Sequence, residues 1–169
     1  ELPRRYRTLF VCGAFGLGSS RQQDVEALRR FHDQLEPGGT LLLDAEVPYA
    51  DARLWRYWRK EERASLPEPM PSPGKRRAAS DGGEYALASR VLDVDPLEQR
   101  SSLEMRAELW RDGQLEAEET RRIDIHHYFA DELRLMIERA GFRDLVVHGD
   151  HVEVEPTPDD DFVVFVATK

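Results

Sequence analysis

Two short apolar runs with an amphipathic segment between them constrain the fold of this chain more than any other feature. The first run is Leu9–Cys12 and the second is Thr40–Asp44, which reads TLLLD. Nearly continuous apolar runs of this length are typical of parallel strands buried on both faces. The segment between them carries apolar residues at helical spacing: Val25, Leu28, Phe31 and Leu35. The order strand, helix, strand predicts a crossover unit and a parallel sheet.

Short signals mark the loop and the ends of this helix. Ser20 stands three residues before Gln23, which is the spacing of a capping box, and a Pro-Gly-Gly sequence from Pro37 ends the helix. The loop after the first run has its three glycines in the order G-x-x-G-x-G, from Gly13 to Gly18. Dinucleotide-binding turns have the order G-x-G-x-x-G. A nucleotide-binding turn is therefore not expected here.

The middle of the chain has a different character. Residues 51–64 are rich in Trp, Tyr, Arg and Glu and predict one amphipathic helix, which is followed by the Pro-rich loop LPEPMPSPG. Three alternating segments come next: Glu84–Val94, Arg100–Trp110 and Gln114–Ile125. An Asp-Gly pair beginning at Asp112 is a strong hairpin signal. These segments predict a three-stranded antiparallel meander.

The middle segment of the meander separates apolar from charged side chains. Its odd positions, from Leu103 to Leu109, are apolar, and its even positions, from Glu104 to Glu108, are charged. Because successive side chains of a strand point to opposite faces, the pattern predicts one buried apolar face and one face in water.

The last part of the chain returns to helix and strand signals. A helical stripe is closed by Gly141 and consists of Leu133, Met136, Ile137 and Ala140. Two apolar strands are predicted at Leu145–His148 and Phe162–Ala167, with an acidic loop between them. His148 and His151 are three residues apart but have no second ligand pair, so no metal site is predicted.

Composition limits the class of protein. A chain of 169 residues predicts one domain with one core. Its 33 acidic and 24 basic residues, with a net charge of -9, disfavour nucleic acid as a partner. The single cysteine, Cys12, excludes an internal disulfide and favours a reducing, cytoplasmic location. No apolar run reaches the roughly 18 residues of a membrane span, so no membrane association is expected.

Two segments carry a resemblance to a known family. PGGTLLLD, which follows an amphipathic helix, and FADELRLMIERAGF, which precedes two closing strands, resemble the C-terminal part of class I S-adenosylmethionine-dependent methyltransferases. The resemblance runs from the strand at Leu9–Cys12 to the C-terminus. It implies an α/β fold, the C-terminal part of a Rossmann-like methyltransferase sheet, with the meander as an insertion similar to those of small-molecule methyltransferases.

The resemblance also implies how the chain is organised. Residues 1–50 form the strand–helix–strand unit, 51–83 a lid helix and the Pro-rich loop, 84–125 the meander, and 126–169 the closing helix with two strands. The family's acidic, Gly-rich cofactor motif does not occur before Leu9. We therefore expect this chain to be the C-terminal portion of a longer enzyme, inactive alone, whose binding of S-adenosylmethionine needs the N-terminal segment.

In this family, the loop that follows the strand at Leu9–Cys12 borders the methyl donor and the acceptor. The resemblance therefore implies that four residues contact the donor: Cys12, Gly13, Ala14 and Phe15. Phe15 would form an apolar wall, whose aromatic face attracts a cationic methyl donor by about 0.5–2 kcal/mol. Glycines that only allow a tight exit from the strand are the alternative explanation of this loop.

Contacts with the acceptor are expected from six residues near the same sheet edge: Leu17, Glu46, Tyr49, Trp55, Trp58 and Tyr128. The aromatic residues among them form either a lid that excludes water or part of the core. Asp44 alternates with Glu46, and either carboxylate is a candidate for binding polar groups of the acceptor. His127 or His126 is the candidate catalytic base, since a neutral imidazole accepts a proton near pH 7, and only one of them can face a given pocket.

The leading hypothesis is methyl transfer from S-adenosylmethionine to an oxygen or nitrogen of a small molecule. A noncatalytic, methyltransferase-like module for dimerisation or partner binding is the alternative, and a nucleotide-dependent oxidoreductase is a weaker one. The strand at Leu9–Cys12 would be an interior strand of the full family sheet, and the residues before it cannot supply its neighbour. Its open edge predicts either a homodimer or pairing with the N-terminal segment.

Overall fold

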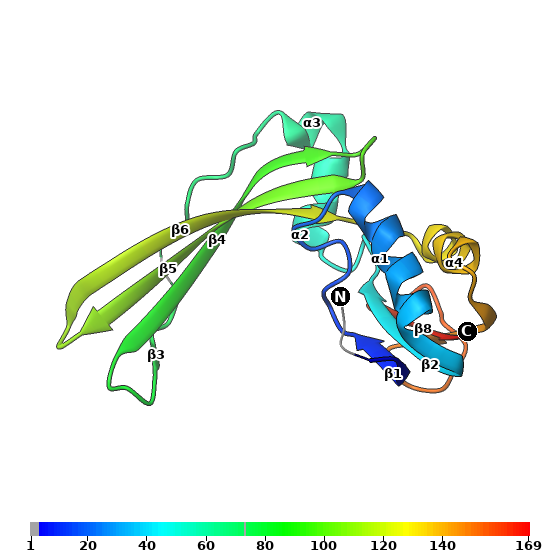
Figure 1. Cartoon of the computed structure of the whole chain (residues 1–169). Coiled ribbons are helices and arrows are strands. Elements are labelled where there is room, and N and C mark those ends of the chain that lie inside the picture. Colours follow the sequence, from blue (N-terminus) through cyan, green and yellow to red (C-terminus); the bar gives the residue numbers. More distant parts are fainter. Residues whose placement is uncertain (1–3, 73) are drawn as a thin grey trace. The chain divides into compact units, whose positions relative to one another are not determined.

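The computed structural model describes residues 4–72 and 74–169. These residues form two compact units (Figure 1). The first unit contains the described residues up to Trp55 together with His126–Lys169, and the second is Arg56–Ile125. Chain length predicts a single core. The segment after Trp55 instead forms a separate sheet, and this sheet belongs to a second unit.

The first unit is built on a four-stranded sheet with the order β1-β2-β8-β7. Its strands are β1 (Tyr6–Val11), β2 (Leu35–Glu46), β7 (Arg143–Gly149) and β8 (Phe162–Thr168). β1 and β2 pair in parallel, which confirms the strand–helix–strand unit. β8 is antiparallel to both β2 and β7, so the predicted parallel sheet is in fact mixed. The reason is that β8 returns directly from β7 and enters the sheet between β7 and β2.

Helix α1 (Arg21–Gln34) connects β1 to β2. The Ser20 hydroxyl accepts a hydrogen bond from the Gln23 amide at 3.3 Å, and the Gln23 side chain accepts one from the Ser20 amide at 2.7 Å. The predicted capping box is therefore confirmed. Strand β2 starts at Leu35, which pairs with Tyr6, and not at the predicted Thr40, which pairs with Thr8. The Pro-Gly-Gly segment between Leu35 and Thr40 bulges out of the ladder.

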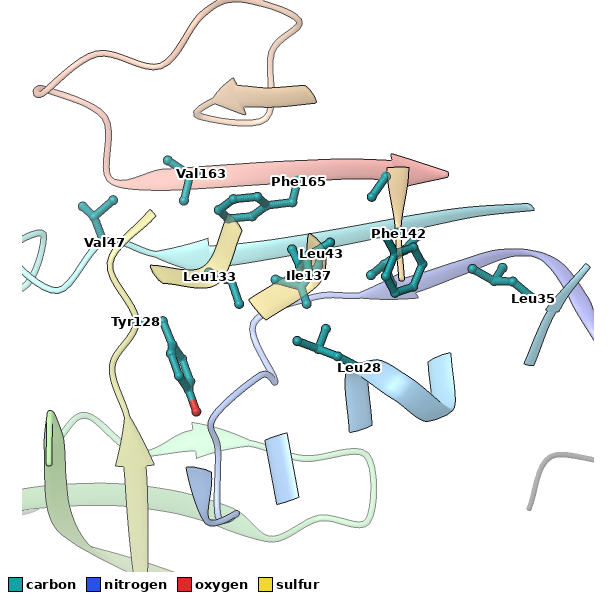
Figure 2. Close-up of a cluster of buried hydrophobic side chains, with 12 residues drawn as sticks. Leu28, Leu35, Leu43, Val47, Tyr128, Leu133, Ile137, Phe142, Val163 and Phe165 are labelled. Atoms are coloured by element: carbon teal, nitrogen blue, oxygen red, sulfur yellow. The ribbon is translucent and has the colours of Figure 1, made fainter. Parts of the chain in front are cut away.

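Helices α1 and α4 (Ala130–Arg139) pack against this sheet. Figure 2 shows the core, where fully buried side chains of both helices meet those of β2 and β8: Leu28, Leu133, Ile137, Leu43 and Phe165. Each such side chain stabilises the fold by about 1.5–3 kcal/mol on burial. Gly141 follows α4 with a left-handed φ of 105°, as the sequence predicts for a residue that ends a helix.

Strand β1 lies at the edge of the sheet, and among the described residues it pairs only with β2. Leu9 and Val11 pack against the core, whereas Phe10 is 64% exposed. The prediction that this strand is buried on both faces is therefore wrong for the described part of the chain. An apolar run predicts a strand but does not show whether both of its faces are covered.

The helix predicted over residues 51–64 is broken into three short pieces: α2 (Ala52–Trp55), the 3-10 turn η1 (Arg56–Trp58) and α3 (Lys60–Arg63). Arg59 has an extended backbone, and the Arg63 guanidinium donates to the carbonyls of Tyr57 and Trp58, which a continuous helix would pair with its own amides. The buried Tyr57 hydroxyl donates to Glu68 at 2.7 Å. None of the described helices is long and apolar enough to cross a membrane.

The second unit is built on a sheet with the order β3-β4-β5-β6. Its strands are β3 (Arg77–Ala78), β4 (Glu84–Asp95), β5 (Arg100–Arg111) and β6 (Gln114–His126). The three long strands, labelled in Figure 1, confirm the predicted meander. The two-residue strand β3 was not predicted, because it is too short to show alternation.

Burial in this sheet contradicts the predicted faces. Met105 is 42% exposed and Leu87 is 63% exposed, whereas Glu108 is only 5% exposed. The Pro-rich segment lies against the charged face, where the Arg106 guanidinium donates to the carbonyl of Pro71 at 3.3 Å. Alternation therefore predicts that a strand has two faces, but not which of them a neighbouring segment covers.

Candidate functional site

Three strands of the first unit end at the same edge of the sheet, which we call the carboxyl edge. β1 and β2 are parallel, so their carboxyl ends lie together. β7 is antiparallel to β8, which is antiparallel to β2, so β7 also runs parallel to β2. The loops that follow β1, β2 and β7 therefore meet at one edge. In open α/β sheets, this is the edge at which ligands bind.

Asp44 of β2 is the centre of a hydrogen-bonded cluster at the carboxyl edge. Its side chain is 3% exposed and accepts hydrogen bonds from three groups. The Gly13 amide donates to Oδ1 at 2.5 Å, and the Cys12 thiol donates to Oδ2 at 3.2 Å. Nε2 of His151 lies 2.9 Å from the same Oδ2 atom. The cluster thus joins the loops after β1 and β7 to the end of β2.

The charge of Asp44 affects the protonation of Cys12. Burial by itself would raise the pKa of Asp44, but the hydrogen bonds from His151, Gly13 and Cys12 outweigh burial and lower the pKa below its ordinary value. Asp44 is therefore ionised at neutral pH. The hydrogen bond to Asp44, followed by the charge of Asp44 and by burial, raises the pKa of Cys12. Cys12 is a thiol under the same conditions and not a thiolate nucleophile.

A tight turn after β7 holds His151 over this carboxylate. Asp150 and His151 both have left-handed backbones, with φ of 40° and 59°, a conformation that non-glycine residues seldom adopt. Oδ1 of Asp150 accepts hydrogen bonds from the amides of Asp161 and Phe162 at 2.9 and 3.0 Å, which stabilises the turn. The His151 ring also packs on the Phe162 ring, with centroids 5.3 Å apart.

The glycines of the loop after β1 have two different roles. Gly13 has a left-handed φ of 56°, and a Cβ placed on it would meet no atom within 4 Å, so its Cα faces open space. A Cβ on Gly16 would lie 2.4 Å from the carbonyl oxygen of His126, and the His126 amide donates to Gly16 at 2.8 Å. Gly16 therefore allows close packing, whereas Gly13 leaves room for a ligand to approach the backbone.

Solved structures of methyltransferases are similar to this chain. The CcbJ methyltransferase from Streptomyces caelestis matches 97% of the chain with a TM-score of 0.61 and 21% identity, and the match covers 61% of that protein. An S-adenosylmethionine-dependent methyltransferase from Clostridium acetobutylicum matches 99% with a TM-score of 0.67 and 10% identity, covering 60% of that protein. DesVI from Streptomyces venezuelae matches 99% with a TM-score of 0.58 and 18% identity, also covering 60%. The chain has their fold.

This similarity confirms the predicted resemblance at the level of the fold. The chain has a Rossmann-like α/β architecture with an antiparallel meander. It spans about 60% of the length of the methyltransferases that it matches. Neither a protein-family model nor a curated protein matches the sequence.

The predicted donor-side residues of this methyltransferase fold lie together. Cys12, Gly13 and Ala14 are exposed and continue directly from β1. Phe15 is half-buried and packs on Tyr128, with ring centroids 5.3 Å apart. The Leu17 amide donates to the Ala14 carbonyl at 3.3 Å, which closes the turn, and the Leu17 side chain is exposed.

Tyr128 lies behind the loop as a buried support. Its hydroxyl donates to Asp24 at 2.5 Å, and the Arg21 guanidinium lies 4.9 Å from its ring centroid. Ser19 donates to the other oxygen of Asp24 at 2.5 Å. Burial, followed by the hydrogen bond to Asp24 and the charge of Asp24, raises the pKa of Tyr128. Tyr128 therefore positions Phe15 and keeps its proton.

The predicted aromatic lid residues are divided between the two units. Tyr49 and Trp55 belong to the first unit, where their rings meet edge to face with centroids 6.2 Å apart. Phe129, which was not predicted, meets the Trp55 ring in the same way at 6.4 Å. Trp58 belongs to the second unit. There it lines a hollow with Arg63 and the turn after β4. The structure thus groups Tyr49 with Trp55 but does not group Trp58 with them.

Both candidate bases are partly buried. Burial, with a smaller effect of His126, lowers the pKa of His127 to about 4, so its imidazole is neutral at pH 7 and a weak base. Nδ1 of His126 is buried and has no hydrogen-bond partner among the described residues. Burial and then the charges of Asp51 and Asp161 raise the pKa of Glu46. The carboxyl edge is therefore rich in negative charge.

The contact between His151 and Asp44 was not predicted from the sequence. In the sequence, His151 stands out only as a possible metal ligand, because His148 is three residues away. The available signal was strand direction: a residue just after β7 must lie at the same edge as Asp44 if β7 runs parallel to β2. No group of three His, Cys, Asp or Glu side chains within the described residues could hold a metal ion.

Proposed function

We propose that this chain forms the acceptor-side part of an S-adenosylmethionine-dependent methyltransferase that modifies an oxygen or nitrogen of a small molecule. The observation that carries the proposal is the shared methyltransferase fold over nearly the whole chain. The methyl donor would bind together with a segment that supplies the Gly-rich motif, as in the longer proteins of this fold. S-adenosylmethionine supplies an electrophilic methyl group on a sulfonium, which leaves as a neutral thioether.

The residues at the carboxyl edge fit such a donor. A sulfonium is a cation, and the ionised Asp44 carboxylate lies directly under the loop of residues 12–17. The open side of Gly13 allows a ligand to approach the backbone. Phe15 adds an aromatic side chain, which Tyr128 fixes in place. Negative charge and an aromatic ring both attract a sulfonium.

The remaining residues would act by positioning and by excluding water. Tyr49 and Trp55 form an aromatic surface in the same unit, suited to an acceptor with an apolar body. Holding two reactants in line supplies roughly 7–11 kcal/mol of the barrier reduction. Since a sulfonium is already activated, such positioning requires few catalytic side chains.

The test uses the longest natural protein that contains this sequence, incubated with methyl-labelled donor and a panel of small amines and hydroxyl compounds. We expect label transfer and an equal amount of demethylated donor. A Phe15→Ala variant should bind the donor more weakly, and Leu97→Ala, which replaces an exposed residue of the second unit, is its control. Absence of both donor binding and methyl transfer would contradict the proposal.

The isolated chain provides a second measurement. We expect calorimetry to detect no micromolar binding of S-adenosylmethionine to the 169 residues alone, because they do not contain the Gly-rich motif. A long protein that binds a partner but neither donor nor acceptor would favour the noncatalytic module. Binding of NAD(P) in a thermal-shift screen would instead favour the oxidoreductase.

A further inference from the structure

We propose that His151 and Asp44 form a proton-accepting pair, in which Nδ1 of His151 takes the proton that a hydroxyl or ammonium acceptor loses on methylation. The inference rests on the proposed function and assigns a catalytic base to it. From the sequence, this role is expected of His127 or His126, and the fold similarity assigns it to no residue.

The geometry orients the imidazole in one way. An ionised carboxylate can only accept hydrogen bonds, so Nε2 of His151, 2.9 Å from Oδ2 of Asp44, carries a proton. In the neutral ring, Nδ1 is then the basic nitrogen. No hydrogen bond from Nδ1 to any described residue is present, and the His151 side chain is 49% exposed. The basic atom is therefore available to a bound acceptor.

The backbone of the turn around His151 has an unusual conformation that hydrogen bonds stabilise. Two successive non-glycine residues, Asp150 and His151, adopt left-handed backbones. Two hydrogen bonds from amides of the following segment to Asp150 offset the cost of this conformation. Strained backbones of this kind cluster at functional sites. Their effect here is to place the imidazole against a buried carboxylate.

Other candidates are less suitable as bases. His127 is buried, with a pKa of about 4, and would hold a proton poorly. The Cys12 thiol is held in its protonated form by the same Asp44 carboxylate. His151 combines an exposed ring with a buried anionic partner, which is the arrangement that orients a histidine and stabilises its imidazolium.

The proton balance of the step is simple. A hydroxyl acceptor loses its proton to Nδ1 as its oxygen lone pair forms the bond to the methyl carbon, and an ammonium acceptor loses it beforehand. The carbon–sulfur bond of the donor breaks, and its electron pair remains on sulfur. Asp44 stabilises the imidazolium, which then releases the proton to water through its exposed side.

Several charged and titratable groups lie around His151. Asp44 of β2 contacts its ring directly, and Cys12 of the loop after β1 shares the same carboxylate oxygen. Asp150 adjoins it in the turn. Glu46 and Asp161 add negative charge at the same carboxyl edge, where they interact with each other.

The first test follows the His151 imidazole by NMR in the chain itself. We expect the Nε2–H tautomer in the neutral ring, because the Asp44 carboxylate can only accept a hydrogen bond. An Asp44→Asn substitution should weaken this preference, and His148→Gln is the matched control and should leave the tautomer unchanged. An Nδ1–H tautomer, or a tautomer preference that is the same in Asp44→Asn, would overturn the inference.

The second test measures methyl transfer by the longest natural protein that contains this sequence. His151→Gln should lower kcat by about 10²–10⁴-fold, with little change in KM for the donor. His148→Gln should match the unchanged protein. An equal kcat for His151→Gln and the unchanged protein would refute the pair, whereas inactivity of the unchanged protein would refute the proposed function instead.

Discussion

The two units of this chain cover their sheets in different ways. The sheet of the first unit is covered by helices α1 and α4, whose leucine and isoleucine side chains meet those of β2 and β8 at zero exposure. In the second unit, Tyr57, Val91 and Val94 are buried together with small or polar residues: Ala86, Ala88, Ser101, Ser102, Glu68 and Glu108. The large residues Leu87 and Met105 of that sheet remain exposed.

The difference shows that two sources of stability operate in one chain. The first unit depends on hydrophobic packing, which needs large side chains on one face of each element. The second unit depends on long antiparallel ladders and on buried carboxylates with hydrogen-bond partners. A buried carboxylate without those partners would destabilise the fold.

Truncation of a core side chain should distinguish the units most strongly. Phe165→Ala removes a fully buried ring from the first unit and should lower the free energy of unfolding by about 3–5 kcal/mol. Leu87→Ala in the second unit should change it by no more than about 0.5 kcal/mol. Urea denaturation, followed by NMR signals of each unit, measures both values. Similar losses of unfolding free energy in the two variants would contradict the proposed difference between the units.

Acid should weaken the first unit through His127. Its pKa is about 4 in the folded chain and has the ordinary value of 6.5 when unfolded. The unfolded state therefore binds the proton more tightly than the folded state. The free energy of unfolding is then highest above pH 6.5, where His127 is neutral in both states, and it decreases as the pH falls toward 4. The loss amounts to roughly 3 kcal/mol. Thermal unfolding between pH 7.5 and 4.5 measures it, and His127→Gln should show a smaller slope; equal slopes would contradict the prediction.

Removal of a buried carboxylate should affect the second unit. Glu68 accepts hydrogen bonds from the Tyr57 hydroxyl at 2.7 Å and the Val91 amide at 2.9 Å. Glu68→Ala leaves both donors without this partner and should cost roughly 2 kcal/mol in the free energy of unfolding. Glu118→Ala, on exposed strand β6, is the control and should have almost no effect. Hydrogen exchange of the Val91 amide checks the result, and unchanged protection in Glu68→Ala would show that the carboxylate is dispensable.

A charge on the exposed apolar face of the meander should have the smallest effect. Met105→Lys should change the free energy of unfolding by no more than about 0.5 kcal/mol, because the side chain is already 42% exposed. Glu108→Leu on the opposite face should destabilise the unit more, since Glu108 accepts from the Trp110 indole at 2.9 Å. A larger loss of unfolding free energy for Met105→Lys than for Glu108→Leu would instead support the buried face that alternation predicts.

The sequence predicted those features that local chemistry determines. The capping box at Ser20, the end of α4 at Gly141 and the Asp-Gly hairpin were found because each depends on a few neighbouring residues. The broken helix was missed because its cause is not local in this sense: Arg63 binds two carbonyls, and Tyr57 turns toward Glu68.

Only the local part of the candidate site could be found from the sequence. The loop of residues 12–17 follows an apolar strand and could be recognised from its pattern. The link between Asp44 and His151 spans more than a hundred residues and depends on the position of β7 in the sheet. Periodicity identifies β7 as a strand but does not show its neighbours, so the pairing needed the structure.

The hydrogen bond from Cys12 to Asp44 also determines how this protein behaves during handling. Alkylating agents and oxidants attack the thiolate, and the neighbouring carboxylate raises the pKa of the exposed Cys12 thiol. The native thiol should therefore react slowly with maleimides and seldom form intermolecular disulfides in air. A cysteine engineered at an exposed site of the second unit would be labelled first, so a dye could be attached there without replacing Cys12.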